Sequence, residues 1–275
     1  MNRLAQILIL FVAAAPSCTP QAVQEADPAN RAPVEPTPVS ATRPANGLLT
    51  LFLKVKIISI DVPVGTVSGS EELWSYLDEE SVQGFRDGNL GRNGLRVGLA
   101  RQNTWPDLAK VLTRMTGGKL QITTGVFLPG DPYPLDIKQD EPIQTIFLTN
   151  SDRTISGADY PPGDNSVMLS CTLNEDDPSK VMVTGVPEIR TTQRQMRLVN
   201  DHGNFSWRAM PTVYSFAPLT FRASIPSKDI VVIGPGSQAR RPYSVGNHFL
   251  VHSREGVEFE KVLVLIPEVL AQPMK

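Results

Sequence analysis

Three groups of residues in this 275-residue chain have types and spacing that could do chemistry. The first is "DIVVIGPGSQARR" (229–241), in which an apolar run leads into glycines, as the strand and phosphate turn of a nucleotide-binding fold do. Such a turn needs a helix directly after it, because the amides at the helix N-terminus hold the phosphate. Pro235, Pro242 and Gly246 predict no stable helix here. We therefore expect a buried strand that ends in a glycine–proline corner and closes a sheet.

The second group is the histidines, His202, His248 and His252. The last two are four residues apart, which on a helix would place both on one face as metal ligands. The surrounding "VGNHFLVHS" has the pattern of a strand, on which residues four apart are separated by roughly 13 Å, too far for one ion. We therefore expect two half-exposed strand histidines and no metal site.

The third group is the acidic clusters "LDEES" (77–81) and "NEDDPSK" (174–180). We interpret the first as a solvated helix face. The second lacks the ligand spacing of a calcium loop and is typical of a polar turn. Cys171 lies within a predicted strand, where we expect a buried apolar residue and no exposed nucleophile. No catalytic residue and no cofactor are predicted, and a hydrolase with carboxylates from distant segments stays open as an alternative.

Five further side chains are candidates for contact with other molecules. Arg240 and Arg241 lie at a predicted turn, where they could bind an anion; a solvated loop tip is the simpler interpretation. Trp207, Tyr214 and Tyr243 are aromatic residues of the kind enriched at protein interfaces. If Trp207 and Tyr214 lined one exposed sheet face, they would instead indicate an extracytoplasmic carbohydrate- or peptide-binding module.

Residues 1–18 predict an export signal. "ILILFVAAA" (7–15) is apolar but shorter than the roughly 20 residues that span a bilayer. "APSC" (15–18) places small residues before a cysteine, as in lipoprotein signals, which predicts that Cys18 is lipidated and becomes the mature N-terminus. Ordinary signal cleavage in the same small-residue stretch is the alternative, and both routes export the protein.

Residues 19–46 have the composition of a disordered tether. The segment holds six prolines and no aromatic residue. Such a sequence cannot bury enough apolar surface to offset the entropy of ordering, so it is expected to stay extended. The folded part is then 47–275, which we expect to form a single β-rich domain.

The folded part changes its pattern along its length. Alternating apolar residues predict a long strand over 48–65 with one buried face, and a capping box predicts a helix over 68–90. Residues 104–118 have the clearest helix pattern, with Thr104 as N-cap and Gly117 as the stop. Beyond this helix, roughly ten short alternating runs predict antiparallel strands with no helix between them. The fold class is therefore mostly β (α+β): an antiparallel sheet domain with one or two helices near its N-terminal side.

The composition argues against one class of partner. The net charge is −2, with 41% hydrophobic and 20% charged residues, which is ordinary for a globular protein. Nucleic-acid binding requires a clear basic excess to neutralise phosphates. We therefore expect no nucleic-acid partner.

The order of motifs resembles the secretin domain, the β-domain of bacterial outer-membrane secretion channels. "LKVKIISIDV" is similar to its first strand, "LAKVLTRMTGGKLQITTGVFLPG" to its helix–strand–proline unit, and "GDNSVMLSCTLNEDDPSKVMVTGVPEIR" to its middle hairpin. The elements that close the domain are matched by "SKDIVVIGPG", "SVGNHFLVHS" and "VEFEKVLVLIPEVL". The resemblance covers about 49–62 and 105–270, and a lipoprotein-type tether stands where that family has its ring-building modules.

The resemblance implies a diverged secretin-like β-domain with a structural or assembly role, in a secretion or pilus-type system, and no enzymatic activity. Its partners would be proteins of the cell envelope or further copies of itself, and a lipid on Cys18 would hold it to a membrane. The expected location is the periplasmic face of a membrane or outside the cell. Thr19 replaces the aspartate that marks inner-membrane retention, which favours the outer membrane.

Overall fold

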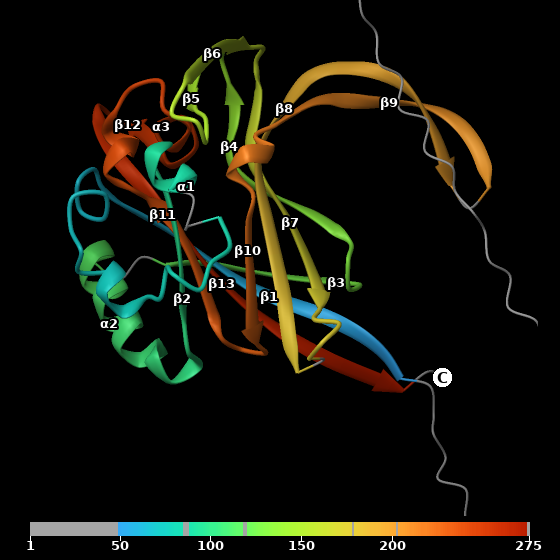
Figure 1. The fold of residues 1–275 in the computed structure, drawn as a ribbon, viewed down its shortest axis with the longest axis horizontal. Coiled ribbons are helices and arrows are strands. Elements are labelled where there is room, and N and C mark those ends of the chain that lie inside the picture. Colours follow the sequence, from blue (N-terminus) through green and yellow to red (C-terminus); the bar gives the residue numbers. More distant parts are fainter. Residues whose placement is uncertain (1–48, 85–87, 118–119, 178, 202, 274–275) are drawn as a thin grey trace, which may run out of the picture. The chain divides into compact units, whose positions relative to one another are not determined.

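Two antiparallel sheets face each other across the main hydrophobic core (Figure 1). The computed structural model describes residues 49–273, except 85–87, 118–119, 178 and 202. The chain divides into Met1–Asn46 and Gly47–Lys275, and all described residues belong to the second unit. The predicted signal, Cys18, the tether and His202 therefore lie outside the described residues.

The larger sheet has the strand order β2–β11–β13–β1–β3, with β12 added beside β13. Its strands are β1 (Leu49–Pro63), β2 (Leu95–Ala100), β3 (Gln121–Phe127), β11 (Ile230–Pro235), β12 (Val251–Arg254) and β13 (Val257–Pro273). β1 pairs with β13 along its whole length. The two described ends of the chain thus form the centre of this sheet.

The second sheet has the order β10–β8–β7–β4, with β9 also paired to β8. Its strands are β4 (Pro132–Glu141), β7 (Gly163–Leu173), β8 (Lys180–Asp201), β9 (Asn204–Ser215) and β10 (Phe221–Pro226). A separate hairpin joins β5 (Gln144–Thr149) to β6 (Ile155–Tyr160). The antiparallel, mostly-β fold class predicted from the sequence is therefore confirmed.

Helices are short and few in the described part of the chain. The α-helices are α1 (Asn89–Arg92), α2 (Trp105–Thr116) and α3 (Val245–Leu250). The 3-10 turns are η1 (Trp74–Tyr76), η2 (Gln102–Thr104), η3 (Ala217–Leu219) and η4 (Ser237–Arg240). Among the described residues, no helix has the length and apolar content needed to cross a membrane.

The central strands of the larger sheet contribute to a hydrophobic core on each face. Leu53, Val55 and Ile57 of β1 belong to the core between the sheets. Ile58 and Ile60 belong to a second core, to which α2 and the segment around η1 contribute. The strand predicted over 48–65 is confirmed, and the prediction that only one of its faces is buried is wrong, because the second face is covered as well.

The helix predicted over 68–90 is wrong. Its N-cap, Ser68, turns to the fully buried Glu260 of β13, which accepts hydrogen bonds from the backbone N–H of Ser68 at 3.1 Å and from its hydroxyl. Glu260 also accepts the N–H groups of Gly65 at 2.8 Å and Val67 at 2.9 Å. A distant carboxylate therefore replaces the local capping box, and the segment consists of turns and the short 3-10 helix η1, in which Trp74 is buried.

The helix predicted over 104–118 is confirmed as α2. Gly117 ends it in the left-handed conformation with φ 63°, which glycine adopts without strain. Leu108, Val111 and Leu112 form its buried face. Thr104 precedes it, but its side chain makes no capping hydrogen bond. The apolar periodicity and the glycine stop were sufficient to locate this helix.

The glycine–proline corner is present, and one expectation around it is wrong. All six residues of β11 are buried. After Gly236 the chain forms η4 and then the unexpected helix α3, because the Ser244 hydroxyl caps it by accepting the N–H of Asn247 at 3.1 Å. His248 lies in α3 and His252 in β12, so the prediction that both belong to one strand is wrong.

Candidate interaction surface

The hairpin formed by β8 and β9 extends beyond the rest of its sheet (Figure 1). β8 is 22 residues long. Its first half pairs with β7 over 181–191, and its second half pairs only with β9, up to Asp201↔Asn204. The middle hairpin expected from the sequence is therefore confirmed, and β8 continues past it into a second hairpin.

One face of the outer part of this hairpin is apolar. In the antiparallel register Met196 lies opposite Ala209, and Leu198 lies opposite Trp207. Phe205 follows on the same face, since alternate residues of a strand share a face. The exposed fractions are 61% for Met196, 53% for Leu198, 68% for Phe205 and 65% for Trp207. We call these four residues the hairpin patch. Large apolar side chains gathered at such exposure are a mark of an interaction site.

The opposite face of the hairpin is mainly polar. Gln195 lies opposite Met210, and Arg197 lies opposite Arg208. The hairpin is therefore amphipathic at the period of a strand, as a sheet is when one face meets an apolar partner and the other meets water. The whole of this arrangement lies outside the two hydrophobic cores.

Both edges of the hairpin lack a strand partner within the described part of the chain. β7 stops pairing with β8 at Thr191, and β9 pairs with β8 alone. An unpaired edge presents N–H and C=O groups to which another strand can add. The hairpin thus offers two edges and one apolar face at the same place.

Aromatic side chains fix the base of the hairpin to the core. Tyr214 of β9 contacts Tyr160 edge to face at 5.4 Å between ring centroids. Tyr160 contacts Phe216 at 5.4 Å, and Phe216 contacts the buried Phe249 of α3 at 5.7 Å. Burial, followed by the neighbouring Tyr214, raises the pKa of Tyr160. Tyr214 is therefore an anchor at the base as well as a partly exposed residue.

The sequence-predicted contact residues separate into two places. Trp207 lies in the hairpin patch, and Tyr214, seven positions later on the same strand, points to the opposite face. Tyr243 lies after η4, where it is 52% exposed and contacts Phe147 edge to face. Arg240 donates from Nε to the Ser68 hydroxyl at 3.1 Å. Arg241 lines a separate pocket.

Several surface residues were missed at the sequence level. Met196, Leu198 and Phe205 belong to the hairpin patch but were not singled out. The signal was present in "QMRLV" and "NFSWRAM", where apolar residues alternate with polar ones. This signal is ambiguous, because alternation alone does not distinguish a strand face that is buried in the core from one that is exposed to solvent.

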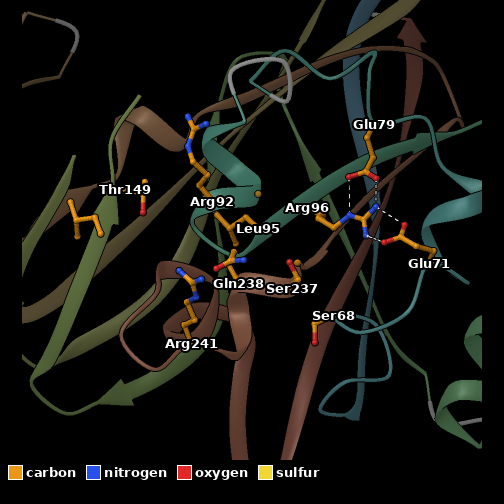
Figure 2. A pocket seen from close by; sticks show the side chains of 13 residues that line it. Ser68, Glu71, Glu79, Arg92, Leu95, Arg96, Thr149, Ser237, Gln238 and Arg241 are labelled. Carbon is orange, nitrogen blue, oxygen red and sulfur yellow. Dashed lines mark hydrogen bonds and ion pairs between the residues drawn. The ribbon is translucent and has the colours of Figure 1, made fainter. Parts of the chain in front are cut away.

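The other reactive groups considered in the sequence are either buried or ion-paired. Cys171 is buried in β7, and burial raises the pKa of its thiol to about 12. Glu71 and Glu79, which lie in one pocket, both bind Arg96 (Figure 2). Arg96 lowers the pKa of Glu71, chiefly through its hydrogen bonds. Both carboxylates therefore share one guanidinium in an ion-pair cluster.

Comparisons with known proteins give structural similarity only. No family model matches the chain, and no curated protein matches it. The secretin domain of InvG from the Salmonella SPI-1 injectisome is 7% identical, with a TM-score of 0.18 over 82% of this chain and 64% of that one. A second InvG structure is 8% identical, with a TM-score of 0.18 over 82% and 66%. Aeromonas hydrophila ExeD is 12% identical, with a TM-score of 0.18 over 82% and 48%.

The two InvG structures are of a secretin from a secretion injectisome. This chain spans less than two thirds of each of their chains. A TM-score of 0.18 does not establish a shared fold. The secretin-like family of this chain therefore stays a prediction.

Proposed function

We propose that this chain is a non-enzymatic assembly protein of the cell envelope, exported and held to a membrane by a lipid on Cys18, and that it assembles with further copies of itself through the β8–β9 hairpin. The observation that carries the proposal is the hairpin patch together with the two unpaired edges beside it. Monomeric proteins rarely keep such a combination of apolar face and open strand edge exposed.

A further copy of the chain is the partner that suits both the β8 edge and the β9 edge of the hairpin. Met196 and Leu198 lie on β8, and Phe205 and Trp207 lie on β9, so each edge carries two residues of the hairpin patch. If β9 of one copy adds to β8 of the next, the apolar residues meet as cross-strand neighbours on one face. The strands of successive hairpins also stay antiparallel in that arrangement.

Such a contact joins the β9 edge of one copy to the β8 edge of the next. Because the two edges differ, the same contact can be made again by each further copy. A head-to-tail interface of this kind gives a ring when the rotation between copies closes and a filament when it does not. A secretion or pilus-type system, which the sequence resemblance implies, is a setting in which repeating envelope assemblies occur.

The test is the oligomeric state of the full chain, with Cys18→Ser to allow purification without detergent. We expect light scattering after size-exclusion chromatography to give an oligomer. The pair of changes Leu198→Ser and Trp207→Ser should yield a monomer with an unchanged circular dichroism spectrum. Tyr76→Ser, at an exposed aromatic far from the hairpin in sequence, is the matched control and should leave the oligomer intact.

A wild-type chain that stays monomeric at every concentration would overturn assembly through the hairpin. An oligomer that survives both serine substitutions would do the same. The membrane part has its own test, because Cys18→Ser should move the protein from the membrane fraction to the soluble fraction, and unchanged fractionation would contradict lipidation.

A further inference from the structure

A pocket of about 490 Å³ opens where β1, β3 and β13 meet the start of α2. Segments that are far apart in the sequence line it, among them the turn that leads into β11. Its volume falls within the roughly 300–1,000 Å³ of small-molecule sites. The pocket shares no residue with the hairpin patch, so it is independent of the proposed assembly.

The alternation of β1 brings two lysines to this pocket. Lys54, Lys56 and Ile58 share one face of the strand, because successive residues point to opposite faces. Ile58 is fully buried in the second core, together with Leu108 of α2. The two lysines lie nearer the N-terminal end of β1, where they are only partly buried. One face of a single strand thus passes from an apolar core to a cationic surface.

The charged groups that line the pocket do not balance. They are three lysines and one glutamate, Lys54, Lys56, Lys228 and Glu268, which gives a net charge of +2. Glu268 is shared by Lys54 at 3.4 Å and Lys228 at 3.2 Å, and the hydrogen bond from Lys228 is the main cause that lowers its pKa. The side chains of these two lysines are 43% and 51% exposed. Ion pairs at such exposure contribute little to stability, so either ammonium group can turn to a second anion.

The third lysine of the pocket, Lys56, pairs with no described carboxylate. Its ammonium group lies over the ring of Trp105, 5.9 Å from the ring centroid. This distance is close to the limit of about 6 Å for a cation–π contact, which is weak at exposed sites. Lys56 therefore holds a positive charge beside an aromatic ring and is open to an anion.

Apolar side chains form the remaining walls of the pocket. Ile230 of β11 is buried at its base, and Ile266 of β13 lies opposite Lys56 in the sheet register. Trp105 and Pro106 contribute the wall at the start of α2. A ligand that reaches the lysines therefore also meets apolar surface, which a fully hydrated inorganic ion does not use.

We propose that this pocket binds a small organic anion with an apolar body. The carboxylate or phosphate group of the ligand would contact Lys56 and one of the two lysines beside Glu268. The apolar body would pack against Trp105 and Ile266. Lysine presents a compact charge on a flexible stem and accepts either kind of anion, so the experiment has to distinguish the two.

Isothermal titration calorimetry at low ionic strength, on the full chain carrying Cys18→Ser, tests the proposal with four probes. Phenyl phosphate and phenylacetate carry both an anion and an apolar ring, inorganic phosphate carries only the anion, and benzyl alcohol carries only the ring. We expect phenyl phosphate or phenylacetate to bind at least about tenfold more tightly than the last two. The tighter of these two ring-bearing anions shows whether the site prefers phosphate or carboxylate.

Two substitutions change the charge of the pocket in opposite directions. Lys56→Gln removes an ammonium group and should weaken binding of the preferred probe by at least about tenfold. Glu268→Gln removes the carboxylate that competes for Lys54 and Lys228, so it should strengthen binding. Lys110→Gln, at an exposed position of α2 outside the pocket, removes the same charge as Lys56→Gln and should bind as the wild type does.

Three results would overturn the proposal. The first is a wild-type protein that binds none of the four probes. The second is binding of inorganic phosphate or benzyl alcohol that is as tight as binding of the ring-bearing anions. The third is equal affinity of Lys56→Gln and Lys110→Gln, or weaker binding in Glu268→Gln, because either would place the ligand elsewhere on the molecule.

Discussion

Gly246 packs directly against the backbone of Gly94. A Cβ placed on Gly246 would lie 2.1 Å from the carbonyl oxygen of Gly94, which is shorter than any van der Waals contact. The same carbonyl accepts the N–H of Gly236 at 2.9 Å, and the N–H of Gly246 donates to Asn93 at 2.7 Å. The start of α3, the end of the glycine–proline corner and the loop after α1 are thus joined through backbone atoms alone.

Gly246→Ala should therefore destabilise the fold strongly. The added methyl group has to push two backbone segments apart, and overpacking of this kind costs about 1–3 kcal/mol. We expect the urea midpoint of the full chain to fall accordingly. Gly91→Ala is the matched control, because nothing lies within 4 Å of its added Cβ and it sits in α1. That variant should be neutral or slightly more stable. Equal stability of the two variants would contradict the close packing.

Glu260→Ala should lower the free energy of unfolding by at least about 2 kcal/mol, since each buried donor left without an acceptor costs about 1–3 kcal/mol. The donors that lose their partner are the N–H groups of Gly65, Val67 and Ser68. Denaturant unfolding followed by circular dichroism measures the change. Glu258→Ala, at an exposed position of the same strand, is the control and should change stability little.

Glu188 should make the protein less stable as the pH rises. Burial, only partly offset by Arg190, raises the pKa of this carboxyl above its ordinary value of 4.5. The folded state therefore holds this proton more tightly than the unfolded state, and the resulting stabilisation is present below pH 4.5 and is lost as the pH rises through the raised value. Glu188→Gln should be more stable than the wild type at pH 7, with the difference shrinking toward pH 4.5.

Unfolding measured from pH 4.5 to 7 tests this prediction. Glu255→Gln, at an exposed turn, serves as the control. A Glu188→Gln protein whose advantage over the wild type does not change with pH would contradict the direction of the pKa shift.

Cys171 should be unreactive in the folded protein. It is 1% exposed and its pKa is raised to about 12, so the thiolate is scarce and shielded at neutral pH. In the Cys18→Ser chain we expect Ellman's reagent to detect no thiol under native conditions and a single thiol in guanidinium chloride. Rapid reaction before unfolding would contradict the burial of this side chain.

Local patterns were enough to predict elements whose residues satisfy each other nearby. The helix at 104–118 has its apolar face and its stop signal within one segment, and β1 shows its alternation directly. The helix over 68–90 failed because the partner of Ser68 is Glu260, which lies 192 residues away. A capping box in the sequence does not reveal that a more distant carboxylate binds the same donors.

The contact site was only partly predictable for a related reason. Trp207 is recognisable as an exposed aromatic residue, but its neighbours in the hairpin patch depend on the register that pairs Leu198 with it. Arg241 was recognised as a possible anion-binding residue, whereas the pocket that it lines forms only where four separate segments of the chain meet. Residues gathered by tertiary structure leave no spacing in the sequence by which to find them.

The continuity of β8 determines how the hairpin transmits mechanical load. The strand runs roughly 70 Å at the usual rise per residue, and its first half is held by β7 on one side and β10 on the other. A pull on the hairpin tip along the strand direction loads these hydrogen bonds together in shear and does not unzip them one at a time. A neighbour that binds the tip is thereby coupled to the second sheet through one strand, which shifts its register against β9 between Arg190 and Arg194.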